Sequence, residues 1–132
     1  MYHMTKFAYS IVFVSDMARS VAFYRDLIGL RVRMESPDWS EFDTAGCTLA
    51  LHKSPGGVTP PVEDGSIPAA HAHPGFNVDD IQAFAAKMAA AGVAVMRPVR
   101  REDFGGWMGV WRDPDGLPVS VVAFEKSTTQ TS

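Results

Sequence analysis

Apolar residues in the first half of the chain show two patterns in turn, short runs typical of strands and the spacing typical of a helix. Residues 7–14 (FAYSIVFV) form a mostly apolar run with the length of a strand. After this run, apolar residues recur at helical spacing, at Met17, Val21, Tyr24 and Ile28. Asp16 precedes this helix as a natural N-cap, and Gly29 stands where a helix ends in the left-handed conformation. The strand pattern resumes over residues 30–34, so this half begins strand, helix, strand.

The second half repeats this order. Residues 74–78 predict a short strand, and Asp79-Asp80 supplies the cap of a second helix, with Gln82 placed for a capping-box contact. The apolar stripe of this helix consists of Ile81, Phe84, Ala85, Met88 and Ala89. Gly92 ends the helix, and a strand follows it. The step from capping aspartate to terminal glycine is 13 residues in the first half and 12 in the second, which indicates an internal repeat.

Each half closes with strand signals around a turn. In the first half, residues 40–44 and 47–52 flank a short Ala-Gly turn. In the second half, residues 107–112 and 117–124 flank Asp-Pro-Asp-Gly at 113–116, a strong turn sequence. The predicted unit is therefore βαβββ, and it occurs twice.

These units predict an α+β fold: two βαβββ modules per chain, forming curved mixed sheets around a ligand cup, with the helices on the outside. A lone sheet of this kind leaves one face bare, so two sheets must pair, within the chain or across a dimer. The predicted boundaries are a first module at 1–53, a Pro/Gly-rich linker at 54–72, a second module at 73–125 and a flexible tail at 126–132.

Two charged stretches are interpreted as solvated surface. The first, residues 97–103, is expected to be a connecting loop, with anion recognition by Arg100 or Arg101 as an alternative that nothing in the sequence supports. The second is the pair Glu41 and Asp43, whose spacing of two puts both carboxylates on one strand face. We interpret that face as a polar outer surface.

Composition excludes several classes of function. The chain has 46% hydrophobic and 20% charged residues and a net charge of −3, with no basic patch, so we expect no nucleic-acid partner. No apolar run reaches the roughly 20 residues that span a bilayer, so we expect no membrane partner. The single cysteine, Cys47, forms no internal disulfide and is interpreted as a small core residue. The expected compartment is the cytoplasm.

Three motifs resemble those of a known family. The run VSDMARSVAFYRDLIGLRV (14–32), the segment HPGFNVDD (73–80) and the segment WRDPDGLPVSVVAF (111–124) are similar, in this order, to the vicinal oxygen chelate superfamily. That superfamily contains glyoxalases, bleomycin-resistance proteins, extradiol dioxygenases and methylmalonyl-CoA epimerases. The resemblance covers roughly residues 7–124 and implies the paired-module fold, but one fold hosts many chemistries.

The resemblance also implies where a metal would be held. Metal-using members place a His, a Glu, a His and a Glu on four strands. In this sequence the motif spacing puts Tyr9, Ala50, His73 and Ser120 at those positions. One usable ligand of four is too few for a catalytic metal, so we expect no cofactor. The alternative is a divalent metal recovered through His52 and His71. His52 would share a strand face with Ala50, and His71 would share one with His73 if that strand starts early.

Six other interpretations concern single side chains. His73 is either a general base or hydrogen-bond donor toward a ligand, or a structural histidine. His52 either contacts a ligand or marks a strand end, and Tyr9 either binds a ligand oxygen or fills the core. The chain has three tryptophans, whose indoles either line the ligand cup or fill the core: Trp39, Trp107 and Trp111. Trp107 and Trp111 are four residues apart, so one strand places them on the same face.

The expected function is binding of a small aromatic or apolar molecule, without a complete metal site, through Tyr9, His73, Ser120 and the residues just named. The alternative is an enzyme of the same superfamily, a lactoylglutathione-lyase-like lyase or isomerase, or a dioxygenase. Such an enzyme is either metal-dependent through His73 and His52 or metal-free with His73 as base. A structural module with a filled cup is the third reading. The resemblance and the bare sheet faces both favour a homodimer.

Overall fold

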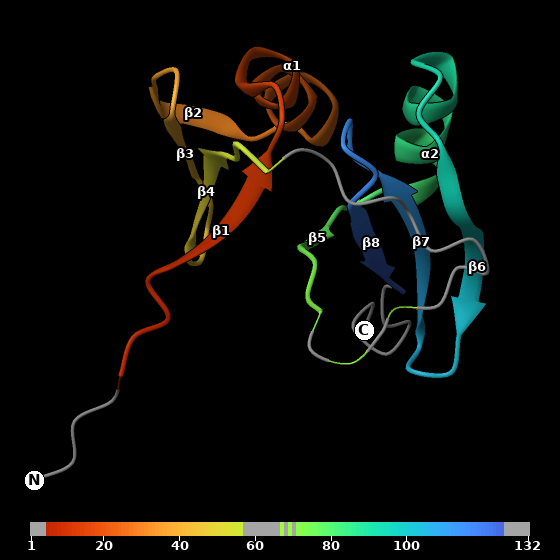
Figure 1. Cartoon of the computed structure of the whole chain (residues 1–132). Coiled ribbons are helices and arrows are strands. Elements are labelled where there is room, and N and C mark those ends of the chain that lie inside the picture. Colours follow the sequence, from red (N-terminus) through yellow and green to blue (C-terminus); the bar gives the residue numbers. More distant parts are fainter. Residues whose placement is uncertain (1–4, 57–66, 68, 70, 126–132) are drawn as a thin grey trace, which may run out of the picture. The chain divides into compact units, whose positions relative to one another are not determined.

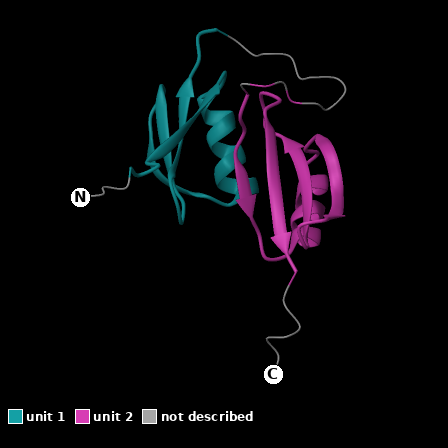
Figure 2. Cartoon of the chain, turned by 90° about the horizontal axis from the view of Figure 1, so that it is seen from below, with its two compact units in different colours: residues 1–59 teal, residues 60–132 magenta. Residues whose placement is uncertain are grey.

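The computed structural model describes residues 5–56, 67, 69 and 71–125 (Figure 1). The chain divides into two compact units, residues 1–59 and 60–132, which are shown separately coloured in Figure 2. The division falls within the predicted linker at 54–72, most of which lies outside the described residues, as does the predicted tail at 126–132.

Unit 1 contains one βαβββ module, as its sequence predicts. Its elements are β1 (Tyr9–Val14), α1 (Met17–Ala22), a π-helical segment η1 (Phe23–Ile28), β2 (Arg31–Glu35), β3 (Trp39–Asp43) and β4 (Thr48–Lys53). The strands are ordered β1-β4-β3-β2, with β1 parallel to β4 and the other neighbours antiparallel. The predicted single helix thus changes from α to π halfway along. It ends at Gly29, whose φ of 94° is left-handed, as predicted.

Unit 2 repeats the same plan. Its elements are β5 (Gly75–Asn77), α2 (Ile81–Ala90), β6 (Val95–Glu102), β7 (Gly106–Arg112) and β8 (Pro118–Phe124). The strand order β5-β8-β7-β6 matches that of unit 1, with the first strand again parallel to the last. The predicted α+β class and the internal repeat are therefore confirmed. No helix among the described residues has the length and apolar character needed to cross a membrane.

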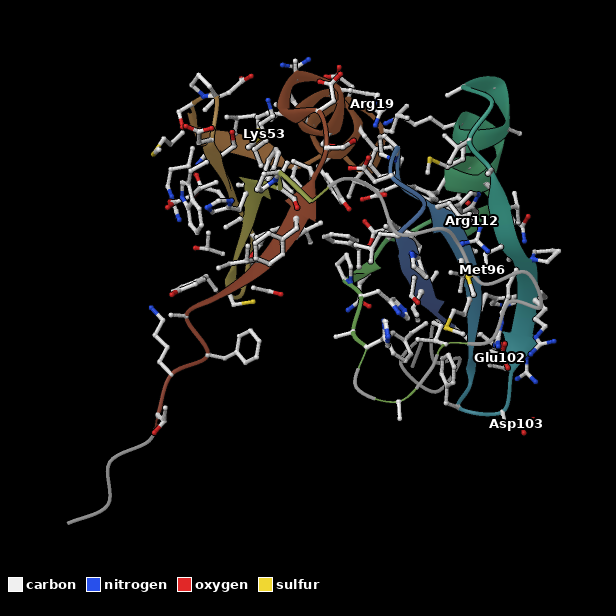
Figure 3. All side chains as sticks on the ribbon, viewed as in Figure 1. Arg19, Lys53, Met96, Glu102, Asp103 and Arg112 are labelled. Atoms are coloured by element: carbon white, nitrogen blue, oxygen red, sulfur yellow. The ribbon has the colours of Figure 1, made fainter. Side chains whose placement is uncertain are left out.

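The charged stretch at 97–103 is a strand rather than the predicted loop. Residues 97–102 belong to β6, an edge strand that pairs only with β7 among the described residues. Figure 3 shows Glu102 and Asp103 at the end of β6 away from Arg112. Arg100 binds Glu102 at 2.9 Å and Arg101 binds Glu125 at 2.5 Å, so both candidate anion-binding guanidinium groups have carboxylate partners. Charged side chains are suited to an exposed sheet edge because they oppose pairing with another chain.

Each sheet buries one face against its own helix. In unit 1 the rings of Tyr24 and Phe42 lie 6.1 Å apart, which places Phe42 on the helix side. In unit 2 the rings of Phe84 and Trp111 lie 5.1 Å apart, which places Trp111 on the helix side. Alternation along each strand sends the neighbouring residues to the opposite face. We call this opposite face the open face of each unit.

The helix caps are the aspartates that precede each helix. The Asp16 carboxylate accepts a hydrogen bond from the Arg19 backbone N–H at 3.1 Å, and Asp80 accepts one from Ala83 at 3.0 Å. The N-cap of α2 is therefore Asp80, and no Asp79–Gln82 capping box is needed to account for it. A cap of this kind satisfies a backbone donor that the helix leaves unpaired.

We expect Asp80→Ala to lower the free energy of unfolding by about 1 kcal/mol, because the Ala83 N–H loses its acceptor. Urea denaturation followed by circular dichroism measures the change. Asp79→Ala is the matched control, since it removes the same charge one residue earlier without removing the cap. Equal losses in both variants would show that charge, rather than the capping bond, is responsible.

Candidate functional site

Aromatic side chains meet on the open face of unit 1. Tyr9 on β1 lies edge-on to Trp39 on β3, with ring centroids 6.4 Å apart, and Trp39 lies edge-on to His52 on β4 at 5.9 Å. Phe13 lies four residues after Tyr9 on the same face of β1, and its ring centroid is 5.6 Å from that of His52. Three strands thus bring together three residues predicted from the sequence, Tyr9, Trp39 and His52, with a fourth, Phe13, that was not predicted. We call these four side chains the aromatic cluster.

A charged network adjoins the aromatic cluster. Arg33 on β2 donates from Nε and Nη2 to Glu41 Oε1 at 3.1 and 2.7 Å, and from Nη1 to Asp43 Oδ1 at 3.1 Å. Its Nη2 also donates to Thr48 Oγ1 on β4 at 2.8 Å. The Trp39 indole donates from Nε1 to Glu41 Oε2 at 2.8 Å. Glu41 therefore joins the network to the aromatic cluster.

The protonation state of Glu41 follows from these contacts. The hydrogen bond from Trp39, and then that from Arg33, lower the pKa of the Glu41 carboxyl below its ordinary value. Glu41 is therefore ionised near neutral pH. The predicted polar outer face of Glu41 and Asp43 is in fact the open face, next to aromatic rings. The sequence offered no signal for this, because Arg33 lies eight residues from Glu41 and on a different strand.

In unit 2, His73 and Ser120 are in contact. The distance from His73 Nε2 to Ser120 Oγ is 2.7 Å, and both side chains are half-buried. Burial lowers the pKa of His73, so the neutral imidazole prevails at pH 7. Two of the four positions at which metal-using relatives hold their ligands are thus bonded to each other.

The strand register identifies the position in unit 1 that corresponds to Ser120. Ser120 pairs with Gly75, which lies five residues before the capping Asp80. In unit 1 the residue five before the capping Asp16 is Ile11, and its partner is Ala50. Ala50 therefore has the place in β4 that Ser120 has in β8, as motif spacing predicts, and the register does not slip toward His52.

These residues do not fit the metal that the superfamily often carries. Ala50 has no ligand atom, and the Ser120 hydroxyl is bonded to His73. His52 Nδ1 lies 2.7 Å from the Lys53 carbonyl oxygen, and His71 is exposed. Over residues 5–56 and 71–125, no three His, Cys, Asp or Glu side chains gather in a way that could hold a metal ion. A catalytic divalent ion normally needs three such groups.

Two of the predicted ligand-binding tryptophans lie away from the open face. Trp107 and Trp111 share a face of β7, as expected, but this face is the one that α2 covers. Trp111 pairs with Val119 and is only 2% exposed. Trp107 is half-buried, and a hydrogen bond with it helps to lower the pKa of Glu125, after the larger effect of Arg101. Both indoles therefore lie outside the candidate site, and the expectation that they bind the ligand is corrected.

Similar folds occur among solved structures. A glyoxalase/dioxygenase from Nostoc punctiforme matches with a TM-score of 0.75 and 19% identity, over 92% of each chain. A lactoylglutathione lyase from Agrobacterium tumefaciens matches with a TM-score of 0.68 and 21% identity, over 92% of this chain and 95% of that one. TioX from Micromonospora sp. ML1 matches with a TM-score of 0.66 and 17% identity, over 89% and 98%. At these identities the likeness establishes the fold alone.

Sequence comparison supplies the family. No curated protein matches this chain. The family model of the Glyoxalase/Bleomycin resistance protein/Dioxygenase superfamily matches residues 3–121, which is most of the sequence and extends from before β1 into β8, the last strand of the second module. The resemblance inferred from the three motifs is confirmed: the chain belongs to the glyoxalase/bleomycin resistance protein/dioxygenase superfamily.

Proposed function

We propose that the protein binds a small aromatic or apolar molecule on its open faces, without a complete metal site. The observation that carries this proposal is the aromatic cluster, in which Tyr9 and Phe13 remain 56% and 62% exposed. Exposed aromatic rings that touch one another offer edges and faces to a planar ligand. Ligand sites combine such apolar walls with a few polar groups, and Glu41 and Arg33 supply polar groups here.

The proposed binding mode uses no metal because the side chains at the four ligand positions are, as a set, poor metal ligands. At the four ligand positions of metal-using relatives, this chain has a tyrosine, an alanine, a histidine and a serine. Neutral hydroxyl groups are poor substitutes for carboxylates on a hard or borderline cation. Binding through aromatic contacts and hydrogen bonds needs no metal, and we propose that this protein works in that way.

A second candidate is a metal-free enzyme, and the contact between His73 and Ser120 favours it. A neutral imidazole can accept a proton, and the 2.7 Å contact between His73 Nε2 and the Ser120 hydroxyl fixes the orientation of the ring. His73 would act as the general base of a lyase or isomerase. Exchange of deuterium at carbon next to a carbonyl group, present in the wild type and absent in His73→Ala, would favour this candidate over simple binding.

A ligand screen tests the proposed function. The protein is prepared without affinity-tag nickel, and a panel of planar aromatic and aliphatic compounds is tested for thermal stabilisation. Ligands that bind the folded state raise its stability by about 2.7 kcal/mol at a concentration of a hundred times Kd. We expect aromatic compounds to stabilise the wild type and to do so less in Trp39→Ala. A panel in which no compound raises Tm would contradict the proposal and favour a structural module.

For a compound that binds the open face of unit 2, where His73 contacts Ser120, we predict that His73→Ala weakens binding by about 1–3 kcal/mol, as loss of a buried hydrogen-bonding group does. Isothermal titration calorimetry measures the change in Kd. His71→Ala is the matched control, because His71 is exposed and two residues away. Unchanged affinity in His73→Ala would show that His73 does not contact the ligand and is a structural histidine.

We propose a homodimer, because each sheet has one face that its own helix leaves uncovered, and pairing with a second copy would cover such a face. We also propose the cytoplasm as the compartment, because the sequence has one cysteine and therefore no internal disulfide.

A further inference from the structure

Glu41 has unused capacity to accept a hydrogen bond beside the aromatic cluster. Its Oε1 accepts two bonds from Arg33, whereas its Oε2 accepts one, from Trp39, among the contacts of the described residues. A carboxylate accepts about four hydrogen bonds. The Glu41 side chain is 28% exposed, so part of it remains accessible to a small molecule lying against Trp39.

The bond to Glu41 also orients the indole. Trp39 Nε1 lies 2.8 Å from Glu41 Oε2, and the same indole lies edge-on to Tyr9 and to His52. Because Arg33 holds the carboxylate through two donors, the carboxylate in turn holds the plane of the indole. Aromatic faces attract cations, and a fixed carboxylate next to them adds to that attraction.

The two guanidinium groups of β2 already have carboxylate partners. Arg33 donates to Glu41, Asp43 and Thr48, and Arg31 lies 3.4 Å from Asp43. An anionic ligand would therefore meet an ionised Glu41, and both guanidinium groups of β2 would already be engaged with carboxylates. A ligand with a protonated nitrogen would meet the free capacity of Oε2 and the aromatic faces together.

From this juxtaposition we propose that the open face of unit 1 selects planar aromatic molecules that carry a cationic nitrogen donor over aromatic carboxylates, and that Glu41 is the residue that selects. The inference rests on the proposed function, because it names the class of ligand for the same aromatic cluster. Glu41 receives the donor at Oε2, and Trp39 and Tyr9 contact the ring.

Three probes of nearly identical shape and different charge test the proposal: 2-naphthamidine, 2-naphthamide and 2-naphthoate. Binding is followed in ¹H–¹⁵N spectra of the full chain through the Trp39 Nε1–H peak, which Trp39→Phe assigns. We expect the amidine to shift this peak and to bind at least about fivefold more tightly than the carboxylate. Glu41→Gln should weaken amidine binding about five- to tenfold and leave the neutral amide within about twofold.

Asp43→Asn is the matched control, since it removes a carboxylate of the same network that does not contact Trp39, and it should change amidine binding by less than about twofold. Equal or tighter binding of the carboxylate in the wild type would overturn the inference, even if Glu41→Gln failed to fold. Loss of amidine preference equally in both variants would overturn the role of Glu41. Either result leaves aromatic binding intact. If none of the three probes moves the Trp39 peak, the proposed function of this face fails as well.

Discussion

Trp111→Ala is expected to lower the free energy of unfolding by about 3–5 kcal/mol, the range found when a buried large aromatic residue is truncated. Trp111 is 2% exposed and packs edge-on against Phe84 of α2 at 5.1 Å, so its removal opens a cavity between the sheet and the helix of unit 2. The cavity would extend over Gly109, which has no side chain to fill it, since a Cβ at that position would lie 2.7 Å from the Trp111 ring. Urea denaturation followed by circular dichroism measures the loss.

Trp107→Ala is the control for Trp111→Ala. Trp107 is the same residue type on the same face of the same strand, but it is only half-buried, so we expect a loss of about 1–2 kcal/mol. If Trp111→Ala lost no more stability than Trp107→Ala, Trp111 would not be the core residue described here. Its place on a ligand-binding face would then need to be reconsidered.

Restoring the missing ligands should create metal binding. Metal-using relatives hold one ion with four such groups, and the variant Tyr9→His, Ala50→Glu, Ser120→Glu gives this chain, together with His73, the same residue types at the corresponding positions. We expect zinc to stabilise this variant by about 4 kcal/mol at a free concentration near a thousand times Kd, and to leave the wild type unchanged. Thermal and urea unfolding, each with and without zinc, measure the difference.

The same variant with His73→Ala is the control, and zinc should stabilise it much less, because one ligand is removed. The variant also tests the register of β4. If Ala50→Glu could be omitted without weakening zinc binding, while replacement of His52 abolished it, then His52 and not position 50 would be the ligand-bearing position.

Much of the fold follows from local signals in the sequence. Asp16 and Asp80 cap their helices, Gly29 takes the left-handed conformation, and the βαβββ order recurs, as the spacing predicts. These features depend on residues close together in the sequence, and elementary backbone chemistry is enough to predict them. The α-to-π change within 17–28 was not predictable in this way, because side chains at helical spacing suit either form.

The candidate site was less predictable because it depends on which strand face meets the helix. Alternation along the strand predicts that Trp107 and Trp111 share a face, but it does not predict whether that face meets the helix. The contact of Trp111 with Phe84 of α2 shows that it is the helix side. Arg33, Glu41 and Thr48 come from three strands, and their contacts require the pairing of β2 with β3 and β3 with β4. The charged residues of β6 likewise predict a loop, because an exposed edge strand can lack the apolar alternation by which strands are predicted.

The central claim is that this member of the superfamily works without the usual metal. Elemental analysis of the untagged protein, purified without chelator and then titrated with Zn²⁺, Ni²⁺, Mn²⁺ and Fe²⁺, tests it most directly. The account predicts no stoichiometric metal in the purified protein and no saturable binding that depends on His73. One metal ion per chain, held in the wild type and lost in His73→Ala, would contradict it.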